Sequence, residues 1–194
     1  MHKQELRMKK IAIFASGAGS NAQKIIDHFK NYSFAKVSLI VCNNSVAGVL
    51  KIASSENIPI LLTEKNKFKS TGYVSELKNS GIEFIALAGF LLKLPDVLIE
   101  SFPGKIINIH PALLPAYGGK GMYGNAVHNA VINAKEKQSG ITIHYVDEKY
   151  DHGKIILQVA CPVTNDDTAE SLAQKIHGLE HKYYPAEIEK ILRH

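Results

Sequence analysis

In the segment KIINIHP, residues 105–111, two polar side chains interrupt the apolar run that follows Lys105. Side chains alternate along a β-strand, so Asn108 and His110 are expected to project from the same face. Pro111 predicts that the strand ends there, at the carboxyl edge where open α/β sheets place ligands. An amide donor beside an imidazole suits the developing oxyanion of acyl transfer. The spacing alone is equally consistent with a strand-end histidine that caps a loop.

A carboxylate is the third candidate for this chemistry. Asp151 lies in a polar loop, residues 147–153. Placed near His110, it would orient the imidazole and raise its pKa. Only the fold can bring the two together, and a solvated loop residue is the alternative interpretation. The other histidines and the two cysteines lack the spacing of a metal site, so no metal is expected.

A glycine-rich segment, residues 16–21 (SGAGSN), separates the first apolar run from the first helical pattern. Gly17 and Gly19 let the backbone approach a ligand, and the N–H groups of a helix N-terminus favour an anion. The segment therefore predicts a phosphate loop in which a Cβ at Gly19 would crowd the anion. A plain turn with Ser20 as N-cap is the alternative.

The same segment also meets a loose G-x-G-x-x-A dinucleotide fingerprint that ends at Ala22. A dinucleotide site would need an acidic residue after the second strand to bind the ribose. That strand is followed by Asn43 and Asn44 instead. The pattern therefore disfavours a nicotinamide cofactor.

Strand-like and helix-like patterns alternate along the first half of the chain. Apolar runs of strand length lie at residues 11–15, 37–42, 58–62, 84–88 and 106–109, and helical periodicity lies between them at 21–29, 46–55, 73–78 and 95–102. This alternation predicts an α/β fold, a Rossmann-like, mostly parallel, twisted open sheet with helices on both faces.

The second half is expected to differ. After a loop containing Gly118, Gly119 and Gly121 and a helix near 126–134, residues 141–146 and 155–163 predict a late strand pair. A C-terminal helix follows, with Asp167 as its expected N-cap in a capping box and Pro185 as an interruption.

Composition is typical of one globular domain over residues 1–194, with residues 1–8 as a flexible leader. The chain is 45% hydrophobic and 21% charged, and no apolar stretch approaches the ~18 residues of a membrane span. The leader lacks the apolar core of a signal peptide, which indicates the cytoplasm. The net charge is +5, but the lysines are scattered, so neither a nucleic-acid nor a membrane partner is expected.

Together these motifs resemble the glycinamide ribonucleotide formyltransferase family from about residue 11 to residue 191. The matching pieces are SGAGSN at 16–21, LAGFL at 87–91, NIHPALLP at 108–115, GITIHYV at 140–146, DHG at 151–153 with ILQ at 156–158, and Glu180-His181. The resemblance implies transfer of a formyl group from 10-formyltetrahydrofolate to the amine of the nucleotide, in the purine (IMP) pathway. It implies a formyltransferase fold, no metal, and a monomer or homodimer.

The family's site residues carry over position by position. The resemblance implies that the backbone at Gly19, Ser20 and Asn21 holds the substrate phosphate and that Glu180 contacts its ribose. Asn108 and His110 would stabilise the oxyanion, with Asp151 keeping His110 charged and relaying a proton through water. The folate pocket would be lined by Asn108 and by four successive residues, Leu91, Leu92, Lys93 and Leu94.

Some positions depart from the pattern common in bacteria. Leu92 stands where arginine is frequent, and His177 stands where glutamine is common. Lys120 could reach an anion, and Lys69 is a candidate contact for the folate. Two alternatives stay open: a deformylase-like hydrolase of formyltetrahydrofolate, and a phosphate-binding module without catalysis.

Overall fold

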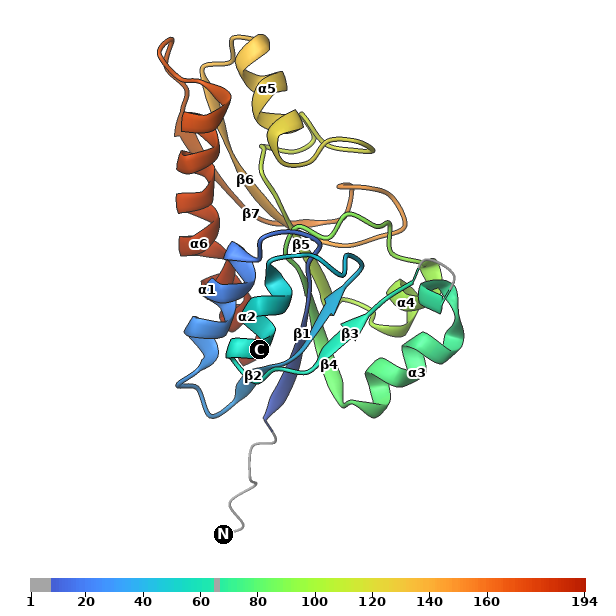
Figure 1. Cartoon of the computed structure of the whole chain (residues 1–194). Helices are drawn as coiled ribbons and strands as arrows, with labels where there is room; N and C mark the ends of the chain where they lie inside the picture. Colours follow the sequence, from blue (N-terminus) through green and yellow to red (C-terminus); the bar gives the residue numbers. More distant parts are fainter. Residues whose placement is uncertain (1–7, 65–66) are drawn as a thin grey trace.

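The computed structural model describes residues 8–64 and 67–194. Its centre is a seven-stranded sheet in the order β3-β2-β1-β4-β5-β6-β7 (Figure 1). The strands are β1 (Lys9–Phe14), β2 (Ala35–Cys42), β3 (Ile60–Leu62), β4 (Ile82–Leu87), β5 (Ile106–His110), β6 (Gln138–Tyr145) and β7 (Ile155–Pro162). Strands β1 to β5 pair in parallel, whereas β6 and β7 are antiparallel to their neighbours. The predicted α/β fold with a mostly parallel sheet and a late strand pair is confirmed.

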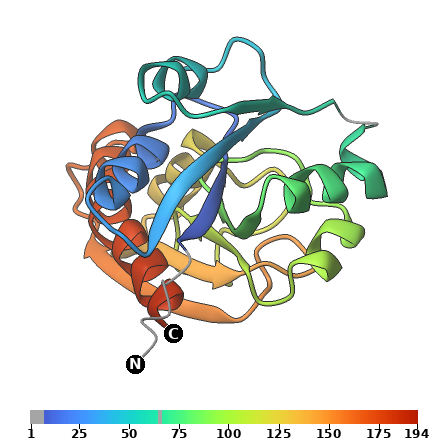
Figure 2. The same cartoon turned by 90° about the horizontal axis from the view of Figure 1, so that it is seen from below.

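Helices cover both faces of this sheet, as Figure 2 shows in a view along it. They are α1 (Ser20–Phe29), α2 (Val49–Ser55), η1 (Lys67–Lys69), α3 (Thr71–Asn79), α4 (Asp96–Ser101), α5 (Asn125–Asn133) and α6 (Ala169–Arg193). No helix among the described residues is long and apolar enough to cross a bilayer. The expected leader, residues 1–8, falls almost wholly outside the described residues.

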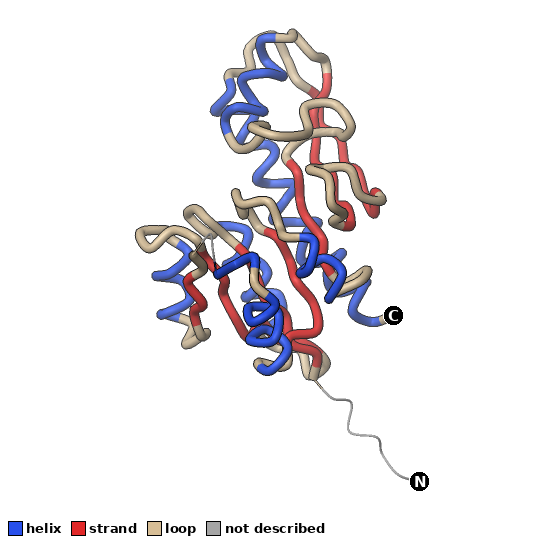
Figure 3. The backbone as a smooth tube through the Cα atoms, turned by 90° about the vertical axis from the view of Figure 1, so that its right-hand side faces the viewer, coloured by secondary structure: helices blue, strands red, loops and turns tan. Residues whose placement is uncertain are grey.

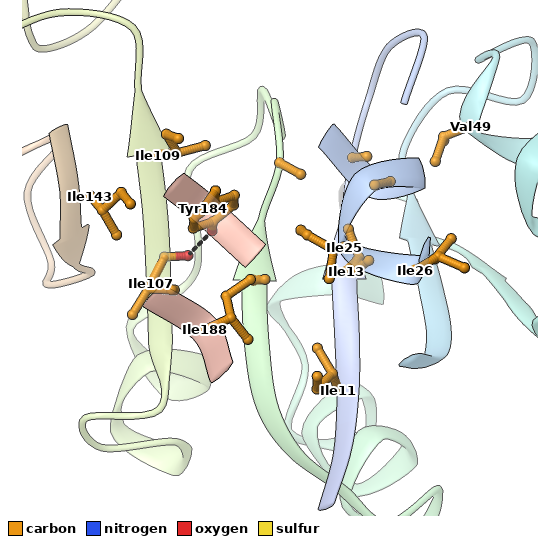
Figure 4. Close-up of a cluster of buried hydrophobic side chains, with 14 of the residues drawn as sticks. Ile11, Ile13, Ile25, Ile26, Val49, Ile107, Ile109, Ile143, Tyr184 and Ile188 are labelled. Atoms are coloured by element: carbon orange, nitrogen blue, oxygen red, sulfur yellow. Dashed lines mark hydrogen bonds between the residues drawn. The ribbon is translucent and has the colours of Figure 1, made fainter. Parts of the chain in front are cut away.

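The two faces carry separate hydrophobic cores because side chains alternate along each strand. Ile11 and Ile13 of β1 point into a core shared with α1, α2 and α6, whereas Ala12 and Phe14 point into a core shared with α3 and α4. Figure 4 shows part of the first core, where Ile25 of α1 and Ile188 of α6 lie near the central strands. A strand buried on both sides must be apolar throughout, which explains the continuous apolar runs.

Helix α6 differs from its prediction in two details. It runs through Pro185 without ending, and its N-cap is Thr168, whose side chain accepts a hydrogen bond from the backbone N–H of Ser171. The Asp167 cap and the interruption at Pro185 were therefore wrong. Asp167 lies one residue earlier and accepts hydrogen bonds from Thr164 and Ser171.

Tyr184 ties this long helix to the centre of the sheet. Its buried hydroxyl lies 2.9 Å from the carbonyl oxygen of Leu87 in β4. It also lies 3.2 Å from the carbonyl oxygen of Ile107 in β5, the contact drawn in Figure 4. Leu87 is the last residue of β4, and Ile107 is the second residue of β5. The contact holds α6 beside the edge of the sheet on which the candidate site lies.

The order of the strands creates that site. From β1 the chain proceeds outward to β2 and β3, and then returns to place β4 on the other side of β1. The segments that leave β1 and β4 therefore diverge at the carboxyl edge, where open α/β sheets form a crevice. The antiparallel β6 and β7 extend this edge beyond β5, as the tube in Figure 3 shows.

Candidate active site

A cavity of about 690 Å³ lies at the carboxyl edge of the sheet. Its lining comes from the segments that follow β1, β4 and β5, from the glycine-rich loop before α5, from the loop after β6, and from α6. This volume is within the ordinary range of small-molecule sites. Among the described residues, no group of three or more His, Cys, Asp or Glu side chains is placed to hold a metal ion.

The structure brings Asn108, His110 and Asp151 together on one wall of this cavity. Asn108 and His110 share a face of β5, as their spacing predicts, and Asp151 reaches them from the loop after β6. His110 Nδ1 lies 3.5 Å from Asp151 Oδ2, and Asn108 Nδ2 donates to Asp151 Oδ1 over 3.4 Å. The solvated-loop interpretation of Asp151 is therefore wrong.

Two backbone groups form hydrogen bonds with the side chains of this cluster. His110 Nε2 donates to the carbonyl oxygen of Tyr117 over 2.7 Å, and the N–H of Gly119 donates to Asp151 Oδ2 over 2.9 Å. Tyr117 and Asp151 have positive φ angles of 57° and 51°, conformations that non-glycine residues rarely adopt. Strain of this kind at the residues that flank an imidazole is characteristic of functional sites.

The electrostatics of His110 differ from the expectation that Asp151 keeps its ring charged. Burial lowers the pKa of its imidazole, and the opposing effects of the Asp151 carboxylate and the Tyr117 carbonyl do not fully offset it. The lowered pKa favours the neutral ring in the unliganded protein. Burial also raises the pKa of Asp151, but the imidazoles of His144 and His110 and the N–H of Gly119 outweigh it, leaving that pKa below its ordinary value.

The predicted phosphate loop lines the same cavity and lies between β1 and α1. Gly19, Ser20 and Asn21 line the cavity there. Gly19 is the N-cap of α1 and its φ of 88° is left-handed, so the alternative with Ser20 as N-cap is wrong. The helix contributes N–H groups at its start without a side-chain cap, the arrangement that favours an anion.

The reason for glycine at position 19 differs from the one expected. A Cβ there would lie 2.9 Å from Val49 Cα and 2.8 Å from Val49 Cβ, so it would collide with α2. The close packing of the loop on α2, together with the positive φ, requires the glycine. Replacing Gly19 would therefore disturb the fold of the loop and would not test phosphate binding alone.

Glu180 lies beside this loop and is buried on α6. Its Oε2 accepts a 2.9 Å hydrogen bond from Asn21 Nδ2. Burial raises the pKa of the Glu180 carboxyl, against lowering effects from Asn21 and His177. The two residues predicted to contact phosphate and ribose are thus joined directly.

The predicted folate-lining residues form a third part of the wall. Leu91, Leu92, Lys93 and Leu94 follow β4, and all four line the cavity. The Leu91 N–H donates to Ser16 Oγ over 2.9 Å, which fastens this segment to the loop after β1. His177 and Lys120 also line the cavity, whereas Lys69 does not.

Two buried histidines in the cavity wall were not identified from the sequence. His144 pairs directly with Asn108 across β5 and β6, and its Nε2 lies 3.2 Å from Asn108 Nδ2. His128 lies on the inner face of α5. For His144 a signal existed, because Thr142 and His144 alternate in the otherwise apolar run 141–146, as Asn108 and His110 do in theirs.

The chain matches the formyl transferase family over residues 9–188, and it belongs to that family. It is 43% identical over 187 residues to the phosphoribosylglycinamide formyltransferase, chloroplastic, of Arabidopsis thaliana, with 93% of this chain and 64% of the relative covered. It is 40% identical to the phosphoribosylglycinamide formyltransferase of Bacillus subtilis, with 95% of each chain covered. The chain spans less than two thirds of the plant relative's length.

A solved structure agrees with this assignment. The crystal structure of phosphoribosylglycinamide formyltransferase from Bacillus halodurans is similar with a TM-score of 0.85 and 36% identity, covering 95% of each chain. At this identity the likeness extends beyond the arrangement of strands and helices to the sequence itself. The predicted resemblance and the formyltransferase fold are confirmed.

Proposed function

We propose that this chain transfers the formyl group of 10-formyltetrahydrofolate to the primary amine of 5-phosphoribosylglycinamide in the purine pathway. The observation that carries the proposal is the position of Asn108, His110 and Asp151. They lie in one cavity between a phosphate-type loop and the segment at 91–94. The names of the relatives describe the same reaction.

The cavity offers each part of the two substrates a matching group. The start of α1 suits the phosphate, and the Glu180 carboxylate suits the ribose hydroxyls. The apolar side chains of Leu92 and Leu94 suit the pterin. A shared cavity lets the protein hold amine and formyl donor together, and such positioning can supply ~7–11 kcal/mol of the barrier.

The reaction itself needs no covalent intermediate on the protein. The amine nitrogen attacks the formyl carbon, the carbonyl oxygen becomes an oxyanion, and the bond from carbon to folate N10 then breaks. The amine loses a proton and N10 gains one, so the products are the formylated nucleotide and tetrahydrofolate. In this proposal the Asn108 amide donates to the oxyanion, a contact worth roughly 2.7–4 kcal/mol.

His110 is suited to respond to that charge. In the unliganded protein, burial lowers the pKa of its imidazole and so favours the neutral ring. A negative charge that develops beside a ring already facing the Asp151 carboxylate raises the pKa again. The imidazole can therefore take up the proton that the amine releases and return it toward N10.

One reaction mixture separates this proposal from the hydrolase alternative. Purified protein is given 10-formyltetrahydrofolate with and without the nucleotide, and both formate and formylated nucleotide are measured. We expect one formylated nucleotide per tetrahydrofolate formed, and formate release at a small fraction of that rate when the nucleotide is omitted. Fast formate production without nucleotide would overturn the transferase and support the deformylase. Tight binding of both ligands without turnover would indicate a binding module.

Two further predictions stay predictions. The cytoplasmic location is one of them, since the Arabidopsis relative is named as chloroplastic and the Bacillus relative is not. The other is a monomer or homodimer, which sedimentation of the purified chain measures directly.

A further inference from the structure

His144 is a buried histidine of the cavity wall to which the proposed function assigns no task. It lies in β6 directly opposite Asn108 of β5, and 2% of its surface is exposed. Both ring nitrogens have polar neighbours at hydrogen-bonding distance. A buried imidazole with two partners has a defined tautomer, and the chemistry of those partners determines which one.

A backbone carbonyl determines whether Nδ1 of His144 carries a proton. Nδ1 of His144 lies 2.8 Å from the carbonyl oxygen of Tyr145, which can only accept a hydrogen bond. Nδ1 therefore carries the proton. In the neutral ring, Nε2 then has a lone pair and can only accept.

Nε2 of His144 lies 3.2 Å from Asn108 Nδ2 and 3.7 Å from Asp151 Oδ1, so Asn108 is the nearer partner and the one within hydrogen-bonding distance. Asp151 determines how the Asn108 amide is oriented. The Asn108 amide group that lies 3.2 Å from His144 Nε2 also lies 3.4 Å from Asp151 Oδ1. A carboxylate can only accept, so this group must be the NH₂ and not the carbonyl oxygen. One N–H of Asn108 then points at the His144 lone pair and the other at Asp151.

We infer that His144, as its Nδ1–H tautomer, is a positioning residue that holds the Asn108 amide for transition-state stabilisation. The inference rests on the proposed function, because the task of the amide is to donate to the formyl oxygen. His144 keeps one N–H over the shorter 3.2 Å contact. The other N–H, whose contact with Asp151 is longer at 3.4 Å, then changes its acceptor and donates to the oxyanion.

Without this acceptor the amide loses its orientation. A terminal amide rotates readily about its last bond, and its two ends differ in sign. If the Asn108 carbonyl oxygen turned toward the formyl oxygen, two oxygen atoms with negative charge would face each other and repel in the transition state. Ground-state binding of either ligand would change little, so the effect belongs in kcat and not in KM.

Two substitutions at position 144 separate this task from simple packing. In His144→Gln the side-chain oxygen can reach the position of Nε2 and still accept from Asn108. In His144→Asn the amide can bond the Tyr145 carbonyl but places no acceptor near Asn108. We expect His144→Asn to lower kcat about tenfold or more, and His144→Gln to stay within about threefold of wild type. Both KM values should change less than about twofold in each variant. Equal kcat for the two variants would overturn the inference.

A double-mutant cycle tests the route through Asn108. On an Asn108→Ala background, His144→Asn should lower kcat no further, because the amide it positions is absent. An unchanged additional loss would show that His144 acts elsewhere. If Asn108→Ala itself leaves kcat at the wild-type value, the proposed function of this site fails. If Asn108→Ala lowers kcat but His144→Asn leaves kcat at the wild-type value, only the inference fails.

A measurement on the wild-type protein covers the case in which a variant does not fold. In ¹⁵N-labelled protein at pH 7.5, the ring nitrogens of His144 report which one carries the proton through their two-bond couplings to the ring protons. We expect Nδ1–H. Observation of the Nε2–H tautomer would overturn the inference, whatever the variants do.

Discussion

Asn21 in the first turn of α1 donates a 2.9 Å hydrogen bond to Glu180 of α6, 159 residues further along the chain. The bond closes one end of the cavity by joining the predicted phosphate loop to the helix that carries the predicted ribose contact. Burial disfavours the charged form of Glu180, and its pKa is raised accordingly. Hydroxyl donors from a bound ribose would replace part of the lost solvation.

The first prediction concerns Glu180→Gln. The substitution keeps an oxygen that Asn21 can reach but removes the carboxylate, so we expect the KM for the nucleotide to rise about tenfold or more. The KM for the folate should change little. Steady-state kinetics with each substrate varied in turn measures both. Glu187→Gln, on the same helix and paired with Lys190, is the matched control. An equal rise in both KM values would argue against a nucleotide contact.

The second prediction treats Asn108, His110 and Asp151 as one unit. His110→Ala should lower kcat at least about a hundredfold, the usual contribution of a positioned general acid–base group. Because groups that act together are not additive, adding Asp151→Asn should lower kcat little further. Single-turnover rates with both substrates saturating measure this. A His110→Ala enzyme with wild-type kcat would remove His110 from the mechanism.

The third prediction concerns the loop that delivers Asp151. A Cβ at Gly153 would lie 1.8 Å from the carbonyl oxygen of Tyr145, so Gly153→Ala must displace the backbone two residues from Asp151. We expect a loss of roughly 1–3 kcal/mol of unfolding free energy, together with a fall in kcat.

Gly178→Ala is the control for that change. A Cβ at Gly178, inside α6, meets no heavy atom within 4 Å. Alanine there should raise the unfolding free energy by roughly 0.5–1 kcal/mol and leave kcat unchanged. Urea unfolding of both variants, read with turnover, decides the matter. A stable and fully active Gly153→Ala protein would contradict the described loop.

The fourth prediction is a pH dependence of stability that comes from His128. Burial lowers the pKa of this imidazole, and the charges of His177 and His110 lower it further. As the pH falls below 6.5, the ordinary pKa of histidine, His128 takes up a proton in the unfolded chain but not in the folded chain. Stability is therefore lost on the acidic side, and one histidine contributes at most ~1.4 kcal/mol per pH unit.

Replacing the group should reduce this slope. Between pH 7.5 and 5.5, the unfolding free energy of His128→Gln should fall less steeply than that of the wild type. His194→Gln, at the exposed last residue of the chain, should keep the wild-type slope. Urea titrations at three pH values provide the comparison. Identical slopes for wild type and His128→Gln would exclude His128 as the source.

Local patterns in the sequence determined a large part of this protein. A strand repeats every two residues, so Asn108 and His110 had to share a face wherever β5 lay. A parallel strand covered by helices on both sides has to be apolar throughout, so the runs at 11–15 and 84–88 predicted the central sheet. Glycines before the first helix predicted the turn that carries the candidate anion site. Errors arose where neighbouring residues offer nearly equivalent solutions, as at Asp167 and Thr168.

Only the tertiary structure decided which distant groups meet. The antiparallel register places His144 opposite Asn108, and the loop after β6 carries Asp151 to His110. Packing of α6 against the sheet brings Glu180 to Asn21. None of these contacts follows from spacing, because each depends on the pairing of strands and the docking of helices far apart in sequence. The lowered pKa of His110 has the same origin, since the burial that causes it exists only once those elements have packed.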